Sequence, residues 1–327
     1  MLPKGTVLFS SRAPIGYCAI AENELCTNQG FKSVVPNEDT SSLFLYYLLV
    51  ANKDAIAGVG SGTTFPEVSG KVMKQFEVVI PEDIDEQEAI ASVLGSIDDK
   101  IELNNRLNDY LFELIQALYG RYCEQCASKV TVGDIAEVID CLHSKKPDKQ
   151  SEGRQLLQLD NIRNDGLLDI EKQYLITEED YQHWITRCEA RQGDCVITNV
   201  GRVGAASQVP PNVHAALGRN MTCVRPLESR HYPTLLITAL TSRSMKAEIE
   251  RKTDTGTIMN ALNVRNIPKL EIPFRDDEFA KGFEKQVRPL QAMREHLLEE
   301  SRQLARLRDT LLPKLMSGEI DVSKVAI

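Results

Sequence analysis

The longest regular alternation of apolar and polar positions runs from Asp85 to Tyr122. Apolar residues recur there at spacings of four and three, which is typical of one face of a long amphipathic helix rather than of a strand. Asp85 followed by Glu88 resembles an N-terminal capping box, and at ~1.5 Å per residue the helix would be roughly 55 Å long. Its apolar positions are Ile90, Leu94, Ile97, Ile101, Leu107, Leu111, Leu114 and Leu118.

A second pattern with the same spacing predicts another long helix from Asp277 to about Met316. Because the segment between the two helices must return the chain, we expect them to pack antiparallel. Three asparagines, Asn104, Asn105 and Asn108, interrupt the apolar face of the first helix. They either fix the register between the helices, as buried polar residues do in coiled coils, or face solvent. The second helix has apolar positions at Phe283, Val287, Leu290, Leu297, Leu304, Leu307 and Leu311.

The chain before the first long helix has the short apolar runs and turn residues of a β-rich domain. One run, Leu43 to Val50, is predicted to be a short buried helix. The last run, Gln75 to Ile80, is predicted to be a strand ended by Pro81. The other predicted strands are Gly5 to Phe9, Tyr17 to Ile20 and Phe31 to Pro36.

The same succession recurs in the second half of the chain. Gly193, Gly204 and Gly218 repeat Gly5, Gly16 and Gly30, each at an offset of 188 positions (193 − 5, 204 − 16, 218 − 30). A period this long indicates a tandem duplication rather than a solenoid. The copies are unequal, because residues 130–192 precede the second Gly-led strand whereas only residues 1–4 precede the first. We therefore expect the chain to start partway through its first domain.

These patterns predict an α+β fold with two β-rich domains, the first one partial, separated by two long antiparallel spacer helices. The expected boundaries are 1–81 for the partial first domain, 82–127 for the first spacer helix, 128–276 for the second domain, and 277–327 for the second spacer helix with the C-terminal tail.

Composition narrows the class of protein. Hydrophobic and charged shares of 42% and 26% are those of a globular protein, and neither a membrane span of ~20 apolar residues nor a secretory signal is recognisable. Eight cysteines without framework spacing favour free thiols in a reducing cytoplasm. Residues 82–127 contain 11 acidic and 3 basic side chains, so they hold −8 of the net charge of −9. The net negative charge of the chain therefore does not exclude a nucleic-acid-binding surface outside residues 82–127.

Several stretches resemble motifs of the specificity subunits of type I restriction–modification systems. The most specific is Leu311 to Ile320, with the sequence LLPKLMSGEI. Val132 to Ala136 (VGDIA) is similar to the opening of a target recognition domain of that family. Further similar stretches are Ile80-Pro81 followed by Glu86-Gln87, blurred at Glu284 to Gln286 in the second helix, and the Gly-Thr loops Gly62-Thr63-Thr64 and Gly256-Thr257.

The resemblance implies a protein without catalytic activity of its own. In that family each target recognition domain reads half of a split DNA sequence. The paired helices separate the two domains and dock modification (methyltransferase) subunits, with motor–nuclease subunits joining indirectly. The implied partners are double-stranded DNA and modification subunits, with no membrane. No cofactor is implied for this chain, because S-adenosylmethionine, ATP and magnesium would belong to the partner subunits. The acidic first helix, including Asp98 and Asp99, is then interpreted as a face kept away from phosphates.

Arg and Lys side chains bind phosphates, whereas Arg, Asn and Gln read base edges. In the first domain the DNA-binding candidates are Arg12, Lys32 and Lys71. In the second domain they are Lys145, Lys146, Arg163, Arg202, Arg219, Asn220 and Lys252. The candidates for helix positions that bind partner subunits are Ile97, Ile101, Leu107, Leu111, Leu297, Leu304 and Leu311. The alternative hypothesis is a recognition-defective scaffold that still binds modification subunits through its helices.

Three other patterns give weaker evidence about function. Cys123-x-x-Cys126 has the spacing of metal ligands, but a tetrahedral site needs four ligands and no second pair is present. The run Gly58 to Gly62 leads into a Phe-Pro pair instead of opening a helix, which favours a loop over a dinucleotide-binding motif. Trp184 with Tyr181 could stack on a base or anchor a core.

Overall fold

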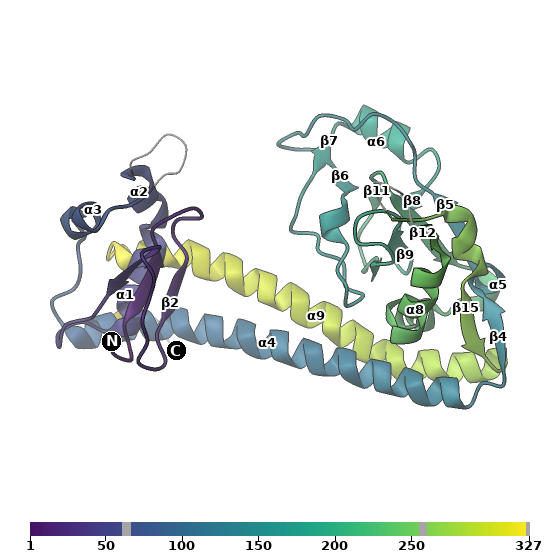
Figure 1. The fold of residues 1–327 in the computed structure, drawn as a ribbon, viewed down its shortest axis with the longest axis horizontal. Coiled ribbons are helices and arrows are strands. Elements are labelled where there is room, and N and C mark those ends of the chain that lie inside the picture. The colour runs from purple at the N-terminus through teal and green to yellow at the C-terminus, as the bar shows by residue number, and fades with distance from the viewer. Residues whose placement is uncertain (61–66, 255–259, 325–327) are drawn as a thin grey trace. The chain divides into compact units, whose positions relative to one another are not determined.

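The computed structural model describes residues 1–60, 67–254 and 260–324, and the chain divides into two compact units. Unit 1 comprises residues 1–105 and 299–327, and unit 2 comprises residues 106–298. The two long helices predicted from the sequence are confirmed as α4 (Ile84–Glu124) and α9 (Asp277–Met316). Each of them contributes one part to unit 1 and the other part to unit 2 (Figure 1). Among helices in the described ranges, none combines the length and apolar character needed to cross a membrane.

In unit 1 a three-stranded antiparallel sheet packs on a buried helix. The strand order is β2-β1-β3, and Val7 of the central strand lies opposite Ile20 on one side and Val34 on the other. The buried helix, α1, is capped by Ser41, whose side chain accepts a hydrogen bond from the backbone of Phe44. The elements are β1 (Val7–Ser10), β2 (Cys18–Ile20), β3 (Phe31–Val34), α1 (Ser42–Ala51), α2 (Lys53–Gly58) and α3 (Gly70–Gln75).

The predicted strand over Gln75 to Ile80 is wrong. Gln75 ends α3, and residues 76–80 form no strand in the structure. A strand needs a partner for its backbone hydrogen bonds, and none is paired with this segment in the described part of unit 1. Its apolar side chains are left in solvent, with Val78, Val79 and Ile80 exposed by 44%, 87% and 40%.

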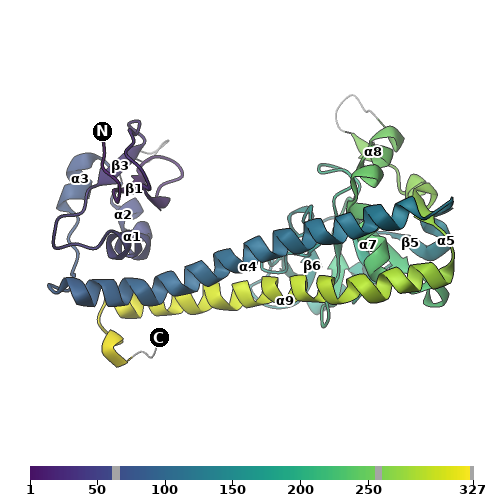
Figure 2. The ribbon, with the colours of Figure 1, turned by 90° about the horizontal axis from the view of Figure 1, so that it is seen from below.

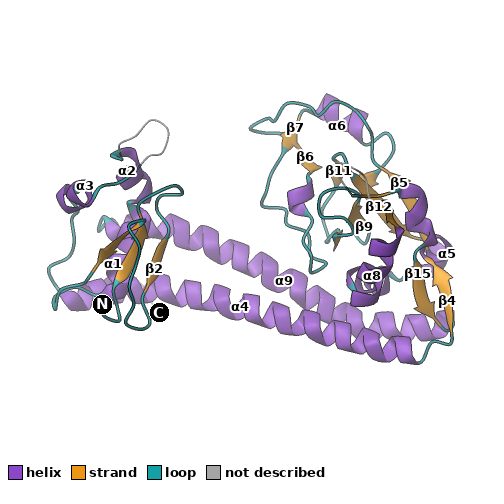
Figure 3. Cartoon of the chain, in the orientation of Figure 1, coloured by secondary structure: helices purple, strands orange, loops and turns teal. Residues whose placement is uncertain are grey.

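Unit 2 contains two four-stranded sheets, ordered β10-β9-β12-β5 and β7-β6-β11-β8, together with the two-stranded pairs β13-β14 and β15-β4 (Figure 3). The strands are β4 (Ser128–Thr131), β5 (Ala136–Asp140), β6 (Arg154–Leu157), β7 (Leu175–Ile176), β8 (Glu189–Ala190), β9 (Cys195–Thr198), β10 (Ala206–Gln208), β11 (Ala215–Leu217), β12 (Met221–Pro226), β13 (Thr253–Asp254), β14 (Ala261–Leu262) and β15 (Glu271–Phe274). The helices are α5 (Val132–Ile135), α6 (Glu178–Trp184), α7 (Pro233–Thr241) and α8 (Arg243–Lys252), with 3-10 turns η1 (Leu159–Asn161), η2 (Glu228–Arg230) and η3 (Val264–Lys269).

The sequence duplication is confirmed as a structural one. In unit 1, Val7 of β1 pairs with Ile20 of β2, and in unit 2, Cys195 of β9 pairs with Gln208 of β10. Both positions are displaced by the same 188 residues (195 − 7, 208 − 20). The predicted Gly-Thr loops and the end of the glycine run fall at residues 61–66 and 255–259, outside the described residues.

The two long helices pack antiparallel within each unit, as predicted (Figure 2). In unit 1 the Nδ2 of Asn104 donates to Glu300 Oε2 at 2.7 Å. In unit 2 the Nδ2 of Asn108 donates to the backbone oxygen of Arg294 at 3.0 Å. Two of the three asparagines therefore fix the helix register, whereas Asn105 faces solvent.

The apolar face was only partly predicted. Leu94 and Ile97 are buried as expected, but Leu107, Leu114 and Leu307 are exposed. The four–three spacing continues instead through the buried Asn104 and Asn108 to Ile115. Because these polar residues occupy apolar-type positions, the pattern was assigned to the wrong side of α4 after Ile101.

Asp98 does not belong to a free acidic face. Its Oδ2 accepts a hydrogen bond from the hydroxyl of Tyr47, and its Oδ1 accepts one from Arg308 Nη1, both at 2.6 Å. Burial, followed by the hydrogen bond to Asp98, raises the pKa of the Tyr47 hydroxyl. Asp98 thus joins α1, α4 and α9 inside unit 1, while Asp99 remains exposed.

A pair of leucine variants tests this packing. Leu94 is fully buried in the unit 1 core, whereas Leu103, on the same helix, is largely exposed. We expect Leu94→Ala to lower the free energy of unfolding by about 2–5 kcal/mol, because it leaves a cavity. Leu103→Ala should change it by less than ~0.5 kcal/mol. Urea unfolding followed by circular dichroism measures both, and equal losses would contradict the packing described here.

Candidate nucleic-acid interface

Three of the predicted DNA-binding residues line one hollow on unit 2. Lys146, Arg219 and Asn220 surround a hollow of about 410 Å³. Lys146 comes from the segment between β5 and β6, whereas Arg219 and Asn220 form the turn between β11 and β12. The three side chains offer two positive charges and an amide, which suit phosphate and base-edge contacts. The hollow is further lined by Leu156, Gln158, Leu159, Asp160, Tyr174, Trp184 and Gly218.

The turn that presents Arg219 is determined by its neighbours. A Cβ atom on Gly218 would lie 2.4 Å from the backbone oxygen of Leu157, so only glycine fits there. Asn220 has a φ of +64°, a left-handed conformation that asparagine tolerates better than most residues. Its backbone oxygen accepts a hydrogen bond from Asn199 at 2.8 Å. The direction of the Arg219–Asn220 pair is therefore set by the backbone.

Aromatic side chains form the other wall. The Lys146 ammonium lies 3.8 Å from the centre of the Tyr174 ring, and the Tyr174 hydroxyl donates to the Pro147 backbone at 2.7 Å. This cation–π contact keeps the lysine on the rim of the hollow. Trp184 and Tyr181 are fully buried, so the prediction of a core anchor is the correct one and base stacking by this pair is wrong.

Arg163 and Arg202 flank η1 in the same unit but bind within the protein. Arg202 donates from Nη2 to the backbone oxygens of Leu159, at 2.6 Å, and of Ile162. Arg163 makes a two-pronged contact with Asp165, its Nη2 lying 2.7 Å from Oδ2. Their charges remain partly exposed, so both retain some capacity to attract an anion.

The remaining predicted DNA-binding residues differ in how free they are. Lys252 donates to Glu248 at 2.8 Å and to the backbone oxygen of Lys269 at 2.5 Å. In unit 1 both Arg12 and Lys32 lie against Glu67, at 3.1 and 3.6 Å, and this carboxylate offsets their charge. The exposed candidates are Lys71 on α3 and Lys145 beside the hollow.

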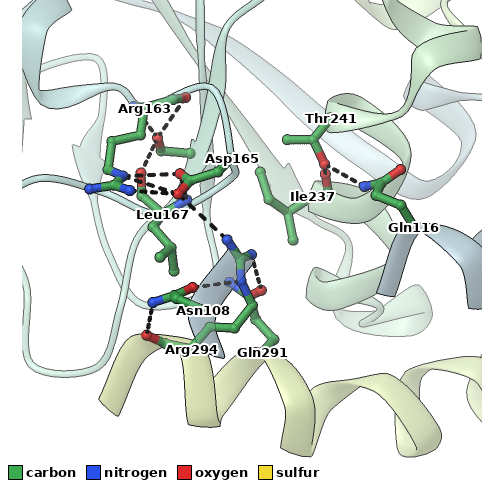
Figure 4. A network of polar contacts seen from close by, with 10 residues as sticks. Asn108, Gln116, Arg163, Asp165, Leu167, Ile237, Thr241, Gln291 and Arg294 are labelled. Atoms are coloured by element: carbon green, nitrogen blue, oxygen red, sulfur yellow. Dashed lines mark hydrogen bonds and ion pairs between the residues drawn. The ribbon is translucent and has the colours of Figure 1, made fainter. Parts of the chain in front are cut away.

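A buried polar network connects the long helices of unit 2 to the loop that carries Arg163 (Figure 4). Arg294 of α9 is only 2% exposed. Its Nε donates to Asn108 Oδ1 at 3.0 Å, its Nη1 donates to Gln291 Oε1 at 3.1 Å, and its Nη2 lies 3.6 Å from Asp165 Oδ2. Asp165 in turn holds Arg163, which places a predicted DNA contact at the end of a chain of contacts that starts on α4.

Burial and charge act in opposite directions in this network. Burial lowers the pKa of Arg294 to about 10, which still leaves it charged at neutral pH. Burial alone would raise the pKa of Asp165, but the hydrogen bond from Arg163 and the charges of Arg163 and Arg294 outweigh it and lower that pKa. Asp165 is therefore the counter-ion on which two arginines depend.

Two further contacts tie α7 to the long helices. The Glu284 carboxylate of α9 accepts hydrogen bonds from the backbone N–H groups of Thr234 and Leu235, at 3.0 and 2.9 Å. These groups lie in the first turn of α7, where a carboxylate also complements the helix dipole. At the other end of α7, Gln116 of α4 donates to Thr241 Oγ1 at 3.0 Å (Figure 4).

The predicted partner-binding positions divide into buried and exposed ones. Ile97 and Leu297 are buried, and Leu107 is exposed; Ile101, Leu111, Leu304 and Leu311 are half-buried. The sequence prediction named Leu107 but missed the exposed apolar row to which it belongs on one face of α4, in which Leu103, Leu107, Tyr110 and Leu114 are 57%, 40%, 61% and 45% exposed. Their spacing of four, three and four was the available signal.

The cysteines and one cluster of possible metal ligands were the remaining candidates for reactive groups among the described residues. All eight cysteines are free thiols, as predicted. Burial raises the pKa values of Cys123 and Cys126, which pack against the unit 2 core. Ligand atoms of Asp140, Cys141 and His143 lie within 4.8 Å of one another. However, Arg187 is 3.5 Å from Asp140 and disfavours a cation there.

Comparison with known proteins agrees with the fold. Residues 1–111 match the family model of the type I restriction modification DNA specificity domain. The chain is 40% identical over 124 residues to the type I restriction enzyme MjaIX specificity subunit of Methanocaldococcus jannaschii. It is 31% identical over 128 residues to the HindI specificity subunit of Haemophilus influenzae. These matches cover 37% and 36% of this chain and 28% of each relative.

The fold likeness extends further along the chain. The crystal structure of the type I restriction–modification S subunit from M. genitalium superposes with a TM-score of 0.59 and 18% identity, covering 96% of this chain and 83% of that one. The class that the fold and these matches define is a duplicated α+β protein built on paired spacer helices. Residues 1–111 thus resemble a type I restriction modification DNA specificity domain in sequence, and the fold of the chain resembles that of a type I S subunit.

Removing Asp165 tests the buried network. We expect Asp165→Ala to lower the free energy of unfolding of unit 2 by about 3–5 kcal/mol, because Arg294 stays buried without its counter-ion. Since the folded-state pKa of Asp165 is lowered, its contribution should be complete above pH ~4 and be lost as the pH falls further. Urea unfolding at several pH values measures this. The exposed Asp160→Ala is the control, and equal stability of the two variants would contradict the network.

Proposed function

We propose that this chain is the DNA sequence-recognition subunit of a type I restriction–modification complex and has no catalytic role of its own. Unit 2 reads one half of a split DNA site, and the long helices bind the modification subunits that carry the methylation chemistry. Motor–nuclease subunits would be directed to the site indirectly. The observation that carries the proposal is the gathering of Lys146, Arg219 and Asn220 around one hollow of a family-like domain.

The chemistry of the hollow favours duplex DNA. Lys146 presents a compact positive charge suited to a phosphate, and Arg219 can bind guanine through two hydrogen bonds in the major groove. Asn220 offers the donor–acceptor pair that matches adenine. Arg163 and Arg202 add partly exposed positive charge in the same unit, and Arg163 is positioned by Asp165.

The exposed row of Leu103, Leu107, Tyr110 and Leu114 on α4 supports the assignment of a protein partner. A contiguous apolar face that remains in solvent marks an interaction surface more often than isolated apolar residues do. The acidic side chains of α4 discourage contact with DNA phosphates. We therefore assign this face, rather than the buried Ile97 and Leu297, to the modification subunits.

Two observations favour the second candidate, a scaffold that binds modification subunits but reads DNA poorly. Among the described strands, the sheet of unit 1 has three members, whereas the equivalent sheet of unit 2 has four. Arg12 and Lys32 are also engaged with Glu67. Co-expression with the modification subunits, followed by methylome sequencing, separates the two candidates. A bipartite methylated motif supports the recognition subunit, and an assembled complex without a motif supports the scaffold.

Substitutions in the hollow separate the two kinds of DNA contact. Arg219→Ala should weaken binding to the cognate sequence by about 1–3 kcal/mol and relax the choice at one base pair. Lys146→Ala should weaken binding to all sequences alike and reduce the salt slope by ~1. Fluorescence anisotropy of the assembled complex with its methylome-defined DNA measures both. Lys129→Ala, an exposed lysine on β4, is the control, and an equal effect of all three would argue against the hollow.

Introducing negative charges on the exposed apolar face of α4 tests whether this face binds the modification subunits. Leu107→Glu together with Leu114→Glu should abolish co-purification with the modification subunits while leaving the unfolding midpoint nearly unchanged, because both side chains already contact solvent. Leu307→Glu, an equally exposed position on α9, is the matched control. Affinity capture and thermal unfolding are the measurements. Retained assembly of the double variant would remove this face as the docking surface.

A further inference from the structure

In unit 2 one short segment completes three separate features of the fold. The segment Ser128–Asp140 comprises β4, α5 and β5. Its first strand pairs with β15, with Val130 opposite Ile272, and its second strand pairs with β12, with Val138 opposite Val224. Between them α5 lies on η3, so close that a Cβ on Gly133 would be 3.2 Å from Pro268. Removing this segment would uncover two strand edges and one turn.

The counterparts of those three features in unit 1 are not covered by any of the described residues. The first is β3, an edge strand among those described, which corresponds to the central strand β12. Val34 and Val224 occupy the same register against β1 and β9. Met221 and Val224 of β12 are fully buried, whereas the equivalent Phe31 is 38% exposed and the equivalent Val34 is half-buried.

The second counterpart is the unpaired segment Glu77 to Ile80, which matches β15 at an offset of 194 (271 − 77). Ile272 and Phe274 of β15 are buried, but the equivalent Val78 and Ile80 are exposed. The Glu271 carboxylate accepts a hydrogen bond from the Lys129 ammonium of β4 at 2.8 Å, and Glu77 is the equivalent carboxylate in unit 1. The segment Glu77 to Ile80 therefore has apolar and charged residues at the same positions as the paired strand β15.

The third counterpart is α3, which corresponds to η3 at the same offset. Ser69 caps α3 as Asn263 caps η3, again 194 residues apart (263 − 69). Ile267 of η3 is fully buried, whereas α3 has no buried residue. The surface that supports α5 in unit 2 is therefore present in unit 1, and no α5-like helix covers it in the part of the chain that the structure describes.

We propose that unit 1 is an acceptor for a strand–helix–strand polypeptide of the Ser128–Asp140 type, which adds one strand to β3 and another to Glu77 to Ile80. Strand addition uses the open backbone donors and acceptors of an edge, and alternate side chains give it specificity. The register of unit 2 places Val130-type and Val138-type residues of the ligand opposite Val78 and Val34. It also places an aspartate equivalent to Asp140 opposite Lys32, a favourable cross-strand charge pair.

The proposal rests on the proposed function and deepens it, because the added polypeptide would complete unit 1 as a DNA-reading domain alongside unit 2. Its test contains no DNA, so its failure is distinguishable from failure of the recognition function of unit 2. The probe is a synthetic peptide with the sequence SKVTVGDIAEVID, copied from residues 128–140, added to the full chain. We expect backbone amide exchange at residues 31–35 and 70–80 to slow by about tenfold or more.

A covalent version removes the limit set by weak peptide affinity. A second copy of residues 128–192 is joined to Gly5 in place of residues 1–4, which reproduces the connection into Gly193 of unit 2. We expect the same two segments to become protected. The control fusion carries Ile135→Asp and Val138→Pro in the added copy only, which removes a core contact and a strand-pairing residue.

Two outcomes would overturn the proposal. Equal exchange in the fusion and in its control would mean that the edges do not accept this polypeptide. Protection of residues 31–35 that instead grows with the concentration of the unmodified chain, together with a doubled mass in sedimentation, would assign the edge to a second copy of the chain. Protection by the peptide and by the intact fusion alone establishes the acceptor.

Discussion

The antiparallel register of α4 against α9 is the constraint on which both units depend. An apolar seam alone would let such helices slide past each other by one turn, because each leucine would then pack against an equivalent apolar residue one turn away. Asn104 and Asn108 remove that freedom through hydrogen bonds to Glu300 and to the Arg294 backbone. With this register fixed, residues of the β-rich part of each unit contact defined residues on both long helices. The polar residues in the seam therefore contribute specificity where apolar residues would contribute only burial.

The extent to which the sequence predicted the fold follows from how local each interaction is. A helix of about forty residues repeats one spacing of apolar residues many times. The sequence therefore predicts the ends of both long helices to within two residues. The side of α4 that is buried was misassigned beyond Ile101, because two asparagines stand where leucines were expected. The strand over Gln75 to Ile80 failed for a different reason: its composition suits a strand, but a strand exists only with a neighbour, which no local pattern reports.

The candidate site shows the same limit. Lys146, Arg219 and Asn220 were each named from residue type, yet their common hollow arises from two segments about seventy residues apart that meet through the sheets. Lys252 and Arg202 were named on the same grounds and are held by backbone oxygens. Backbone acceptors have no signature in a sequence, so residue type cannot separate a free cation from one that supports a turn.

The ties between α7, the Arg163 loop and the long helices also bear on modularity. Glu284 binds backbone N–H groups, and Gln116 binds the Thr238 carbonyl as well as a hydroxyl. A β-rich domain of foreign sequence grafted between the helices would bring such backbone groups with it. Arg294 is different, because it needs a carboxylate at the position of Asp165. A transplanted domain would therefore need an acidic side chain at the position of Asp165, as well as apolar side chains that pack on Tyr119, Tyr122 and Phe283 of the long helices.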